Sequence, residues 1–196
     1  YTGNGIAGTF ALNGANDFPG NVFLNASGTI SANKFGNQYS TDSGLGAGYR
    51  VRFNSGYATG AKLKYTGVGE TSDRLFELNA PAKFEQAGAG LLVLSRPFSI
   101  TTTSGISITL LGSSTGAGEI SGALSNGTSS AVAIVKEGSG TWTLSAPNMF
   151  TGAVTVNNGV LALSQPNRYS AATTVNGGTL ALTGVAGAVT NTSAFT

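Results

Sequence analysis

The most closely spaced carboxylates of the chain lie around Arg74. Glu70, Asp73 and Glu77 fall within the segment GETSDRLFEL. Clustered acids can bind calcium or act as a pair on a glycosidic bond, which is the chemistry of polysaccharide lyases and hydrolases. Part of the segment is expected to be a loop, in which Arg74 would neutralise its neighbours. Asp73 and Glu77 are therefore the candidate residues of one possible function, a polysaccharide-cleaving enzyme.

Positive charge is concentrated in the same part of the chain. Eight of the ten basic residues lie at positions 34–96, where Arg50 and Arg52 share one face of an expected strand and Lys62 and Lys64 repeat the pattern twelve residues later. If the two strands stack, these four residues form a basic strip that could bind acidic glycans or lipopolysaccharide. The alternative is a solvated outer face that keeps a flat sheet soluble.

Other chemistries lack their residues. The chain has no cysteine and no histidine, which excludes disulfides, a Ser-His-Asp triad, a Cys-His pair and the common zinc ligand sets. Aspartate occurs only at positions 17, 42 and 73, too few for a periodic calcium ladder. We expect no cofactor and no metal site. The formal charge of +2 is too small to indicate nucleic-acid binding.

The composition favours strands and tight turns. The 196 residues include 30 glycines, 40% hydrophobic residues and only 9% charged residues, a profile of a chain that folds. No run of about 18 apolar residues occurs, so no segment is expected to span a bilayer as a helix.

A short repeat organises the C-terminal part of the chain. Residues 140–158 read GTWTLSAPNMFTGAVTVNN, residues 159–177 read GVLALSQPNRYSAATTVNG, and a third copy opens at 178 with GTLALT. Residues 8–25 read GTFALNGANDFPGNVFLN and align with 140–157 at an offset of 132. The sequence therefore has two periods, a rung of about 19 or 20 residues and a larger unit of about 132.

Each rung is expected to contain two strands and a corner. The first strand alternates, which places its large residues in core columns: Phe10, Leu12, Trp142, Leu144, Leu161, Leu163, Leu180 and Leu182. The second strand ends at a corner where Asn and Gly tolerate positive φ: Asn25, Asn157, Asn176, Gly159 and Gly178. Rungs stacked about 4.8 Å apart would pair their backbones and bury these columns.

These features predict an all-β, single-stranded, right-handed parallel β-helix (β-solenoid). An up-and-down antiparallel barrel is the alternative, but it has no reason to repeat residue types at a fixed spacing. Proline cannot donate a ladder hydrogen bond, so Pro147-Asn148 and Pro166-Asn167 are expected to mark loops that leave the sheet. The aromatic residue after each, Phe150 or Tyr169, is a ligand platform or a staple that holds the loop to the body.

The string GSGTWTLSAPNMFTGAVTVNNGVLAL at residues 138–163 closely resembles the autotransporter-associated β-strand repeat of large bacterial surface proteins. Residues 8–25 are similar, although Pro19 stands where Thr151 stands in the other copy, and residues 63–79 resemble the spacer between such repeats. The resemblance implies a passenger-type β-helix, secreted and displayed on the bacterial cell surface. It implies no catalytic residues.

We therefore expect residues 1–196 to form one continuous solenoid segment, with recognisable copies at 1–32 and 138–196 and more divergent rungs at 33–137. The expected function is a non-catalytic structural or adhesive segment of an extracellular fibre. Both ends resemble positions inside a repeat, so the expected partners are further repeats of the same polypeptide or copies of the chain stacked end to end. A glycan-binding module that uses the basic strip, with surface polysaccharide as partner, is the alternative.

Overall fold

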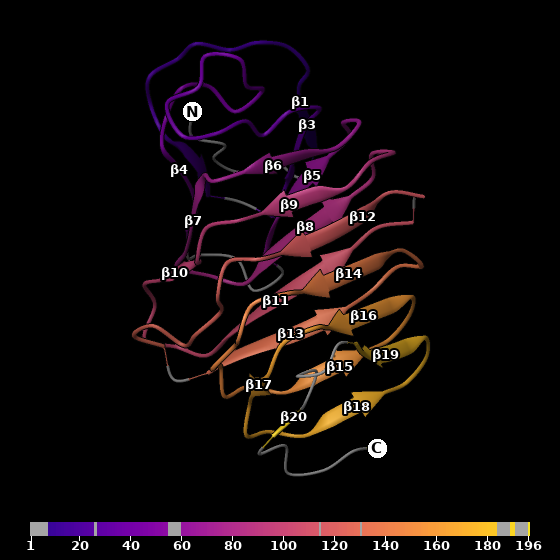
Figure 1. Ribbon diagram of the computed structural model, residues 1–196. Coiled ribbons are helices and arrows are strands. Elements are labelled where there is room, and N and C mark those ends of the chain that lie inside the picture. The colour runs from indigo at the N-terminus through magenta and orange to yellow at the C-terminus, as the bar shows by residue number, and fades with distance from the viewer. Residues whose placement is uncertain are drawn as a thin grey trace.

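The computed structural model describes residues 8–25, 27–54, 60–113, 115–129, 131–183, 189–190 and 196. These residues form parallel strands stacked as a β-solenoid of about eight turns, which confirms the predicted fold class (Figure 1). The strands of successive turns lie above one another from the N-terminal to the C-terminal end (Figure 1). The expected repeat positions at 1–7 and 191–195 lie outside the described residues. No helix in the described part of the chain is long and apolar enough to cross a membrane.

The strands form three main sheets and one small sheet. In spatial order, the eight-stranded sheet contains β1 (Thr9–Leu12), β3 (Thr29–Ala32), β5 (Ala61–Tyr65), β8 (Ala82–Gln86), β11 (Ile106–Leu111), β13 (Val132–Lys136), β15 (Val154–Val156) and β18 (Thr173–Val175). The six-stranded sheet contains β19 (Thr179–Leu182), β16 (Val160–Leu163), β14 (Thr141–Leu144), β12 (Ala117–Ile120), β9 (Leu92–Leu94) and β6 (Glu70–Ser72). The four-stranded sheet contains β10 (Ser99–Ile100), β7 (Leu75–Leu78), β4 (Arg50–Phe53) and β2 (Val22–Leu24), and β17 (Asn167–Arg168) pairs with β20 (Val189–Thr190).

A turn therefore has three faces, one more than the sequence predicts. In the turn of β5, β6 and β7 the chain passes from the eight-stranded sheet to the six-stranded sheet and then to the four-stranded sheet, whereas β1 and β3 are followed directly by strands of the four-stranded sheet. In later turns the third face narrows to isolated bridges, one between Ser125 and Met149 and one between Asn148 and Asn167. The third face is missed because alternation shows that a segment is a strand but not which sheet the strand joins.

The predicted rung length holds only in part. Thr141 pairs with Val160, and Val160 with Thr179, so strands in the C-terminal copies recur with the period of the sequence repeat. In the middle of the chain the recurrence is longer, because Ile106 pairs with Val132. It is longer still between β3 and β5, where Thr29 pairs with Lys62, whereas Thr9 pairs with Thr29 at close to the C-terminal spacing. Extra residues in loops leave the strand register intact because only the strands must stack.

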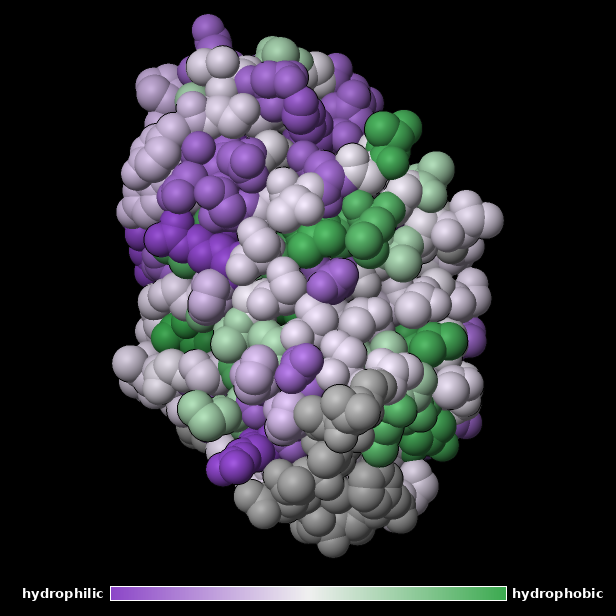
Figure 2. Space-filling view, in the orientation of Figure 1, coloured by the Kyte–Doolittle hydropathy of each residue, from purple (hydrophilic) through white to green (hydrophobic). Residues whose placement is uncertain are grey.

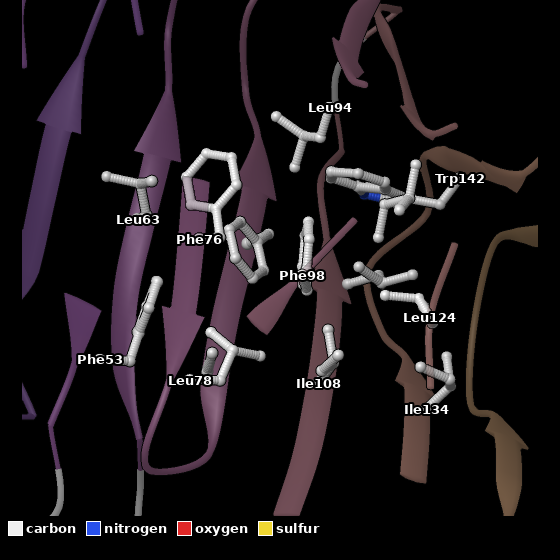
Figure 3. Close-up of a cluster of buried hydrophobic side chains, with 14 of the residues drawn as sticks. Phe53, Leu63, Phe76, Leu78, Leu94, Phe98, Ile108, Leu124, Ile134 and Trp142 are labelled. Carbon is white, nitrogen blue, oxygen red and sulfur yellow. The ribbon is translucent and has the colours of Figure 1, made fainter. Parts of the chain in front are cut away.

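The inner faces of the sheets enclose one hydrophobic core (Figure 3). Phe53 and Phe76 from the four-stranded sheet meet Phe84 from the eight-stranded sheet, each with its ring centroid 5.3 Å from that of Phe84. Phe98 also lies 5.3 Å from Phe84. Such offset or edge-to-face pairs add about 1 kcal/mol beyond the area they bury. This aromatic cluster fills the core of the middle turns of the solenoid, where the sequence repeat is weakest.

The columns proposed from the repeat are real in the C-terminal rungs. Trp142 pairs in register with Leu161 and Leu144 with Leu163, and all four side chains are buried. Leu180 continues the first column and packs partly buried against the core.

The core assignment is wrong at the two ends. Leu182 is 48% exposed and Phe10 is 37% exposed, while Leu12 is partly buried. Phe10 lies in β1 and Leu182 in β19, which among the described strands have a neighbour on one side only in their sheets. Within the described residues, the core therefore thins at these two strands.

The offset of 132 does not align equivalent strands. β1 lies in the eight-stranded sheet, whereas β14, its counterpart at that offset, lies in the six-stranded sheet. β2 and its counterpart β15 are also in different sheets. Phe10 and Leu12 therefore share no column with Trp142 and Leu144. Alternating residues fit any face of the solenoid, so the pattern alone cannot say which sheet a strand joins.

At the predicted corners, glycine and asparagine have different roles. Gly159 and Gly178 adopt φ values of 68° and 78°, as left-handed corner residues must. The corner asparagines do not: Tyr39 is the only residue other than glycine with a positive φ in the described ranges. The asparagines instead bond to one another, because Asn176 Nδ2 donates to Asn157 Oδ1 at 2.8 Å. Asn25 similarly accepts a hydrogen bond from Asn54.

The Pro-Asn dipeptides do not leave the solenoid. Asn148 and Asn167 are buried and stacked, and Asn148 Nδ2 donates to Asn167 Oδ1 at 2.8 Å. Asn148 also accepts from the backbone N–H of Leu124 at 2.8 Å. Phe150 and Tyr169 are fully buried and stacked, with centroids 5.2 Å apart and planes 4° from parallel. Phe150 and Tyr169 therefore hold this segment to the core and are not a ligand platform. The third face of the C-terminal turns is stabilised by an asparagine ladder and an aromatic ladder that lie close together in the sequence.

Candidate functional site

Three residues of the acidic cluster, Glu70, Asp73 and Arg74, contact the β3–β4 loop, which we define as residues 33–49. Glu70 accepts hydrogen bonds from the backbone N–H groups of Phe35 and Gly36, the second at 3.0 Å. Asp73 accepts from the backbone N–H of Gln38 at 2.9 Å. Both carboxylates are therefore occupied in holding the loop.

Arg74 is the centre of this clamp. Its side chain is fully buried, and its guanidinium group donates to the carbonyl oxygens of Phe35 (3.1 Å), Asn37 (3.0 Å) and Gly46 (2.8 Å). It also donates to Gly48 O and, at 3.1 Å, to Ser43 Oγ. Burial lowers the pKa of Arg74 to about 10, although the charges of Glu70 and Asp73 oppose the shift. A planar fork with five N–H donors suits such a set of backbone acceptors.

Glu77 lies outside the loop and binds two arginines. Its carboxylate contacts Arg50 Nη1 at 2.7 Å and Arg52 Nε at 3.0 Å. Arg52 and Glu77 are directly opposite on the paired strands β4 and β7. The three acids around Arg74 thus face three different partners and do not converge on a common point. Glu70 and Asp73 thus hold the β3–β4 loop, and Glu77 bridges two arginines of β4.

The predicted basic strip does not form. Arg50 and Arg52 lie on β4 in the four-stranded sheet, whereas Lys62 and Lys64 lie on β5 in the eight-stranded sheet. The two lysines pair with Glu85 on β8, at 2.6 Å and 3.3 Å. The strip requires the two strands to stack, but strands adjacent along the chain turn onto different faces in a solenoid.

The two lysines keep the carboxylate of Glu85 ionised. Burial by itself would raise the pKa of Glu85, but the hydrogen bonds and charges of Lys62 and Lys64 outweigh it and lower the pKa. The carboxylate is therefore ionised at neutral pH and holds both lysines on the outer face of β5 and β8. Such cross-strand pairs each contribute a few tenths of a kcal/mol up to about 1 kcal/mol.

The β3–β4 loop presents an aromatic surface. Tyr39 is 70% exposed and has φ 62°. Its ring lies 6.2 Å from that of Tyr49, with the planes 32° apart. The guanidinium carbon of Arg50 lies 5.3 Å from the centre of the Tyr49 ring. Tyr39, Tyr49 and Arg50 thus form a continuous surface, which we call the Tyr39 platform. The sequence marks Arg50, but nothing in its local pattern distinguishes Tyr39 from other loop residues.

Lys136 is a buried cation that the sequence analysis missed. It occupies a core column between Leu110 and Val156 and is fully buried. Its Nζ donates to the carbonyl oxygens of Glu137 (2.8 Å), Gly138 (2.7 Å) and Asn158 (3.3 Å). Burial lowers its pKa to about 8, against the charge of Glu137. Alternation in VAIVK places Lys136 on the inward face and is the signal that could have found it.

Gln86 makes similar hydrogen bonds at the corner after β8, two turns before the corner that Lys136 caps. It is buried at the end of β8, and its amide nitrogen donates to the carbonyl oxygens of Gly90 and Ala117, the second at 3.3 Å. Its Oε1 accepts from Gly88 N at 2.7 Å. A long polar side chain at the end of the strand therefore caps the corner in both turns, whether or not it is charged.

Among the residues that the structure describes, no three His, Cys, Asp or Glu side chains are grouped so that they could hold a metal ion. The charged side chains described above bind one another or their own backbone. The site is thus a rigid loop on a parallel β-solenoid, held by a buried arginine and carrying an exposed aromatic surface.

Comparison with known proteins relates this solenoid to a family. A family model described as passenger-associated-transport-repeat matches residues 134–163 and 159–182. The chain is also 35% identical over 98 residues to the Adhesin BmaC autotransporter of Brucella suis biovar 1 (strain 1330). That alignment covers 48% of this chain and 3% of the adhesin. No solved structure matches it.

The chain therefore carries passenger repeats of the autotransporter kind, which confirms the resemblance seen in residues 138–163. The matched repeats contain the regular strand register, the corner glycines and the asparagine ladder. The Tyr39 platform and its clamp lie outside the segment that the family model matches.

Proposed function

We propose that this chain is a non-catalytic segment of a secreted bacterial surface adhesin, in which the solenoid is a stiff support and the β3–β4 loop is a contact surface. The similarity to an autotransporter adhesin supports the adhesive role, and the passenger repeats support export to the cell surface. The observation that carries the proposal is the clamp. Glu70, Asp73 and Arg74 hold the β3–β4 loop through its backbone.

A clamp of this kind suits adhesion better than catalysis. The carboxylates and the guanidinium that would do acid–base chemistry are engaged with the loop backbone, and Arg74 is fully buried. A contact surface gains from this arrangement because a loop already ordered in the free protein loses little entropy on binding. The adhesive role therefore uses the charged residues as supports.

Adhesion can be tested with beads coated with the purified full chain. We expect coated beads to attach to host cells or to extracellular matrix more than beads coated with a variant in which Arg74 is replaced by methionine. Beads coated with a Gly20→Ala variant are the matched control, because a Cβ at Gly20 would meet nothing within 4 Å. Equal attachment of all three preparations to the target and to a blank surface would refute an adhesive role.

The second part of the proposal is that rungs continue into a longer fibre, through further repeats of the polypeptide or through copies stacked end to end. Two observations support it. Strands in the C-terminal copies keep one regular register from rung to rung. Beyond them Thr196 pairs with the outer edge of β18, since Val175 N donates to Thr196 O at 2.9 Å and Thr196 N to Thr173 O at 3.0 Å.

Electron microscopy of the native material tests the fibre. We expect elongated rods, because stacked rungs grow along one axis only. Short particles of uniform length would contradict this part of the proposal and leave the adhesive role untouched.

A further inference from the structure

We propose that the Tyr39 platform is a binding site for an oligosaccharide that carries a carboxylate. The inference rests on the proposed adhesive function, and it names the site and the class of ligand. It replaces the basic strip as the location of glycan binding, since the four residues of that strip lie on two sheets.

The backbone at Tyr39 is the first argument. A bulky residue with positive φ is an outlier that costs about 1–2 kcal/mol, and such conformations persist only where the surroundings impose them. At Tyr39 the surroundings act through the preceding residue, Gln38. Asp73 accepts a hydrogen bond from Gln38 N at 2.9 Å, and Arg96 donates to Gln38 Oε1 at 2.7 Å. The Tyr39 ring gains no burial in return, because the residue is 70% exposed. The strain therefore holds the ring out in solvent.

The shape of the platform is the second argument. The rings of Tyr39 and Tyr49 lie side by side, 6.2 Å apart and tilted by 32°. A pyranose ring has a flat face of C–H groups and an edge of hydroxyl groups. A tyrosine ring offers a flat apolar surface with a polar tip, which matches both parts of a sugar; here Tyr39 is exposed and Tyr49 is half-buried. Two adjacent rings can accommodate more than one sugar unit.

Charge is the third argument and selects a carboxylate. Arg50 and Arg52 share the single carboxylate of Glu77, which leaves one positive charge in excess. The side chain of Glu77 is only 9% exposed, whereas those of Arg50 and Arg52 are 26% and 32% exposed. A ligand therefore meets guanidinium groups and not the carboxylate. Guanidinium groups bind carboxylates through paired, charge-assisted hydrogen bonds.

The surroundings favour a sugar over a protein. The other exposed residues of the β3–β4 loop are polar: Asn33, Asn37, Thr41 and Asp42. A stable protein interface has an apolar centre, and this loop offers only the two rings. Figure 2 shows hydrophilic residues gathered over the upper left of the molecule, where Figure 1 places β4 and its preceding loops. A hydroxyl-rich ligand can bond to such a rim without losing hydrogen bonds to water.

The test is a titration of the full chain with 3′-sialyllactose and with a galacturonic acid oligomer, with lactose as the neutral probe, followed by NMR and calorimetry. Tyr39→Asn removes the ring with a residue that tolerates positive φ, so the loop keeps its conformation. We expect it to weaken binding of the acidic probes at least 10-fold. Arg50→Gln should remove the preference for acidic probes over lactose.

The matched control is the double variant Lys62→Gln and Lys64→Gln, which alters an equally charged outer surface on the eight-stranded sheet. It should bind as the unaltered chain does. The fold of each variant is checked by the hydrogen-exchange protection of the amides of Gly36 and Gln38, which donate to Glu70 and Asp73 and therefore report the β3–β4 loop itself. Absence of binding to every probe, binding unchanged in Tyr39→Asn, or equal loss in the control would each overturn the proposal.

The bead assay separates this inference from the adhesive function. Beads that attach to cells while the acidic saccharides neither bind nor compete would leave the adhesive role in place and overturn the sugar site. Attachment lost after protease treatment of the target, with no effect of saccharides, would assign the loop to a protein partner. Saccharide binding without attachment would overturn the adhesive role and keep the site.

Discussion

Replacing Arg74 with methionine should release the β3–β4 loop and leave the C-terminal rungs intact. The guanidinium group donates to four carbonyl oxygens and one hydroxyl of that loop. Methionine fills part of the same space but donates no hydrogen bond. The acceptors of Arg74 would then be left in the interior without their partner.

The size of the effect follows from burial and from the number of acceptors. Each buried acceptor left without a donor costs about 1–3 kcal/mol. Water can reach some of the loop carbonyls once the side chain is shortened, so the costs do not add in full. We expect a loss of about 3–5 kcal/mol, the range seen when a buried charged network is broken. Arg74→Lys should lose less, because it keeps the charge but has only three donors in place of a planar fork.

Hydrogen exchange is the assay, because it reports each part of the solenoid separately. The amides of Gly36 and Gln38 donate to Glu70 and Asp73 within the clamp, and their protection should fall at least about 100-fold. The amides of Val160 and Thr179 bond to the preceding rung and should be protected as before, since a solenoid couples only neighbouring turns. Unchanged protection at Gly36 and Gln38, or an equal loss at all four amides, would refute the clamp.

Three further predictions concern the corners and ladders. Gly159→Ala should destabilise the chain by about 2–4 kcal/mol in urea unfolding, because the φ of Gly159 is 68° and a Cβ would overlap neighbouring backbone oxygens. The control Gly20→Ala should not change the stability. Equal unfolding midpoints for the two variants would contradict the role of Gly159. Asn148→Ala should lower the free energy of unfolding by about 2–3 kcal/mol, because it leaves the buried backbone N–H of Leu124 without its acceptor. A double-mutant cycle with Asn167→Ala should give a coupling energy of about 1 kcal/mol. Additive losses would show that the hydrogen bond between the two asparagines contributes nothing. Because the pKa of Lys136 is about 8 in the folded chain and 10.5 ordinarily, the unfolded chain binds more protons between these values, so the free energy of unfolding should rise by up to about 2 kcal/mol from about pH 8 to about pH 10. Lys136→Gln should abolish that rise, and its persistence would assign the pH dependence to another group.

Local pattern was enough to predict the strands of the C-terminal copies. The alternation in TWTL and VLAL placed Trp142 and Leu161 inward, and both are buried one above the other. The same reasoning failed for Pro147-Asn148, because proline marks an irregular backbone whether the following residue turns outward or into a buried ladder. Lys136 was not singled out, although the alternation in VAIVK places it on the inward face.

The candidate site was less accessible to sequence reasoning. The acidic cluster and the arginines were found, but their partners were not. Arg50 bonds to Glu77, 27 residues away, and Arg74 to Gly46, 28 residues away. These separations exceed the period of the C-terminal repeat because loops lengthen the rungs in the middle of the chain. Tyr39 carries no signal of its own, since its backbone conformation is imposed by a carboxylate of the next turn, far along the chain.

By itself the sequence determined that this protein stacks parallel strands into a solenoid, and where its C-terminal corners lie. A constant repeat period specifies which side chains recur above one another, and stacking requires nothing more. Only the tertiary structure decided which sheet each strand joins and therefore which charges meet. Arg50 and Lys62 follow the same pattern twelve residues apart but lie on different faces. The β3–β4 loop is held by Arg74, a residue of the following turn, so its hydrogen bonds are defined only in the folded chain.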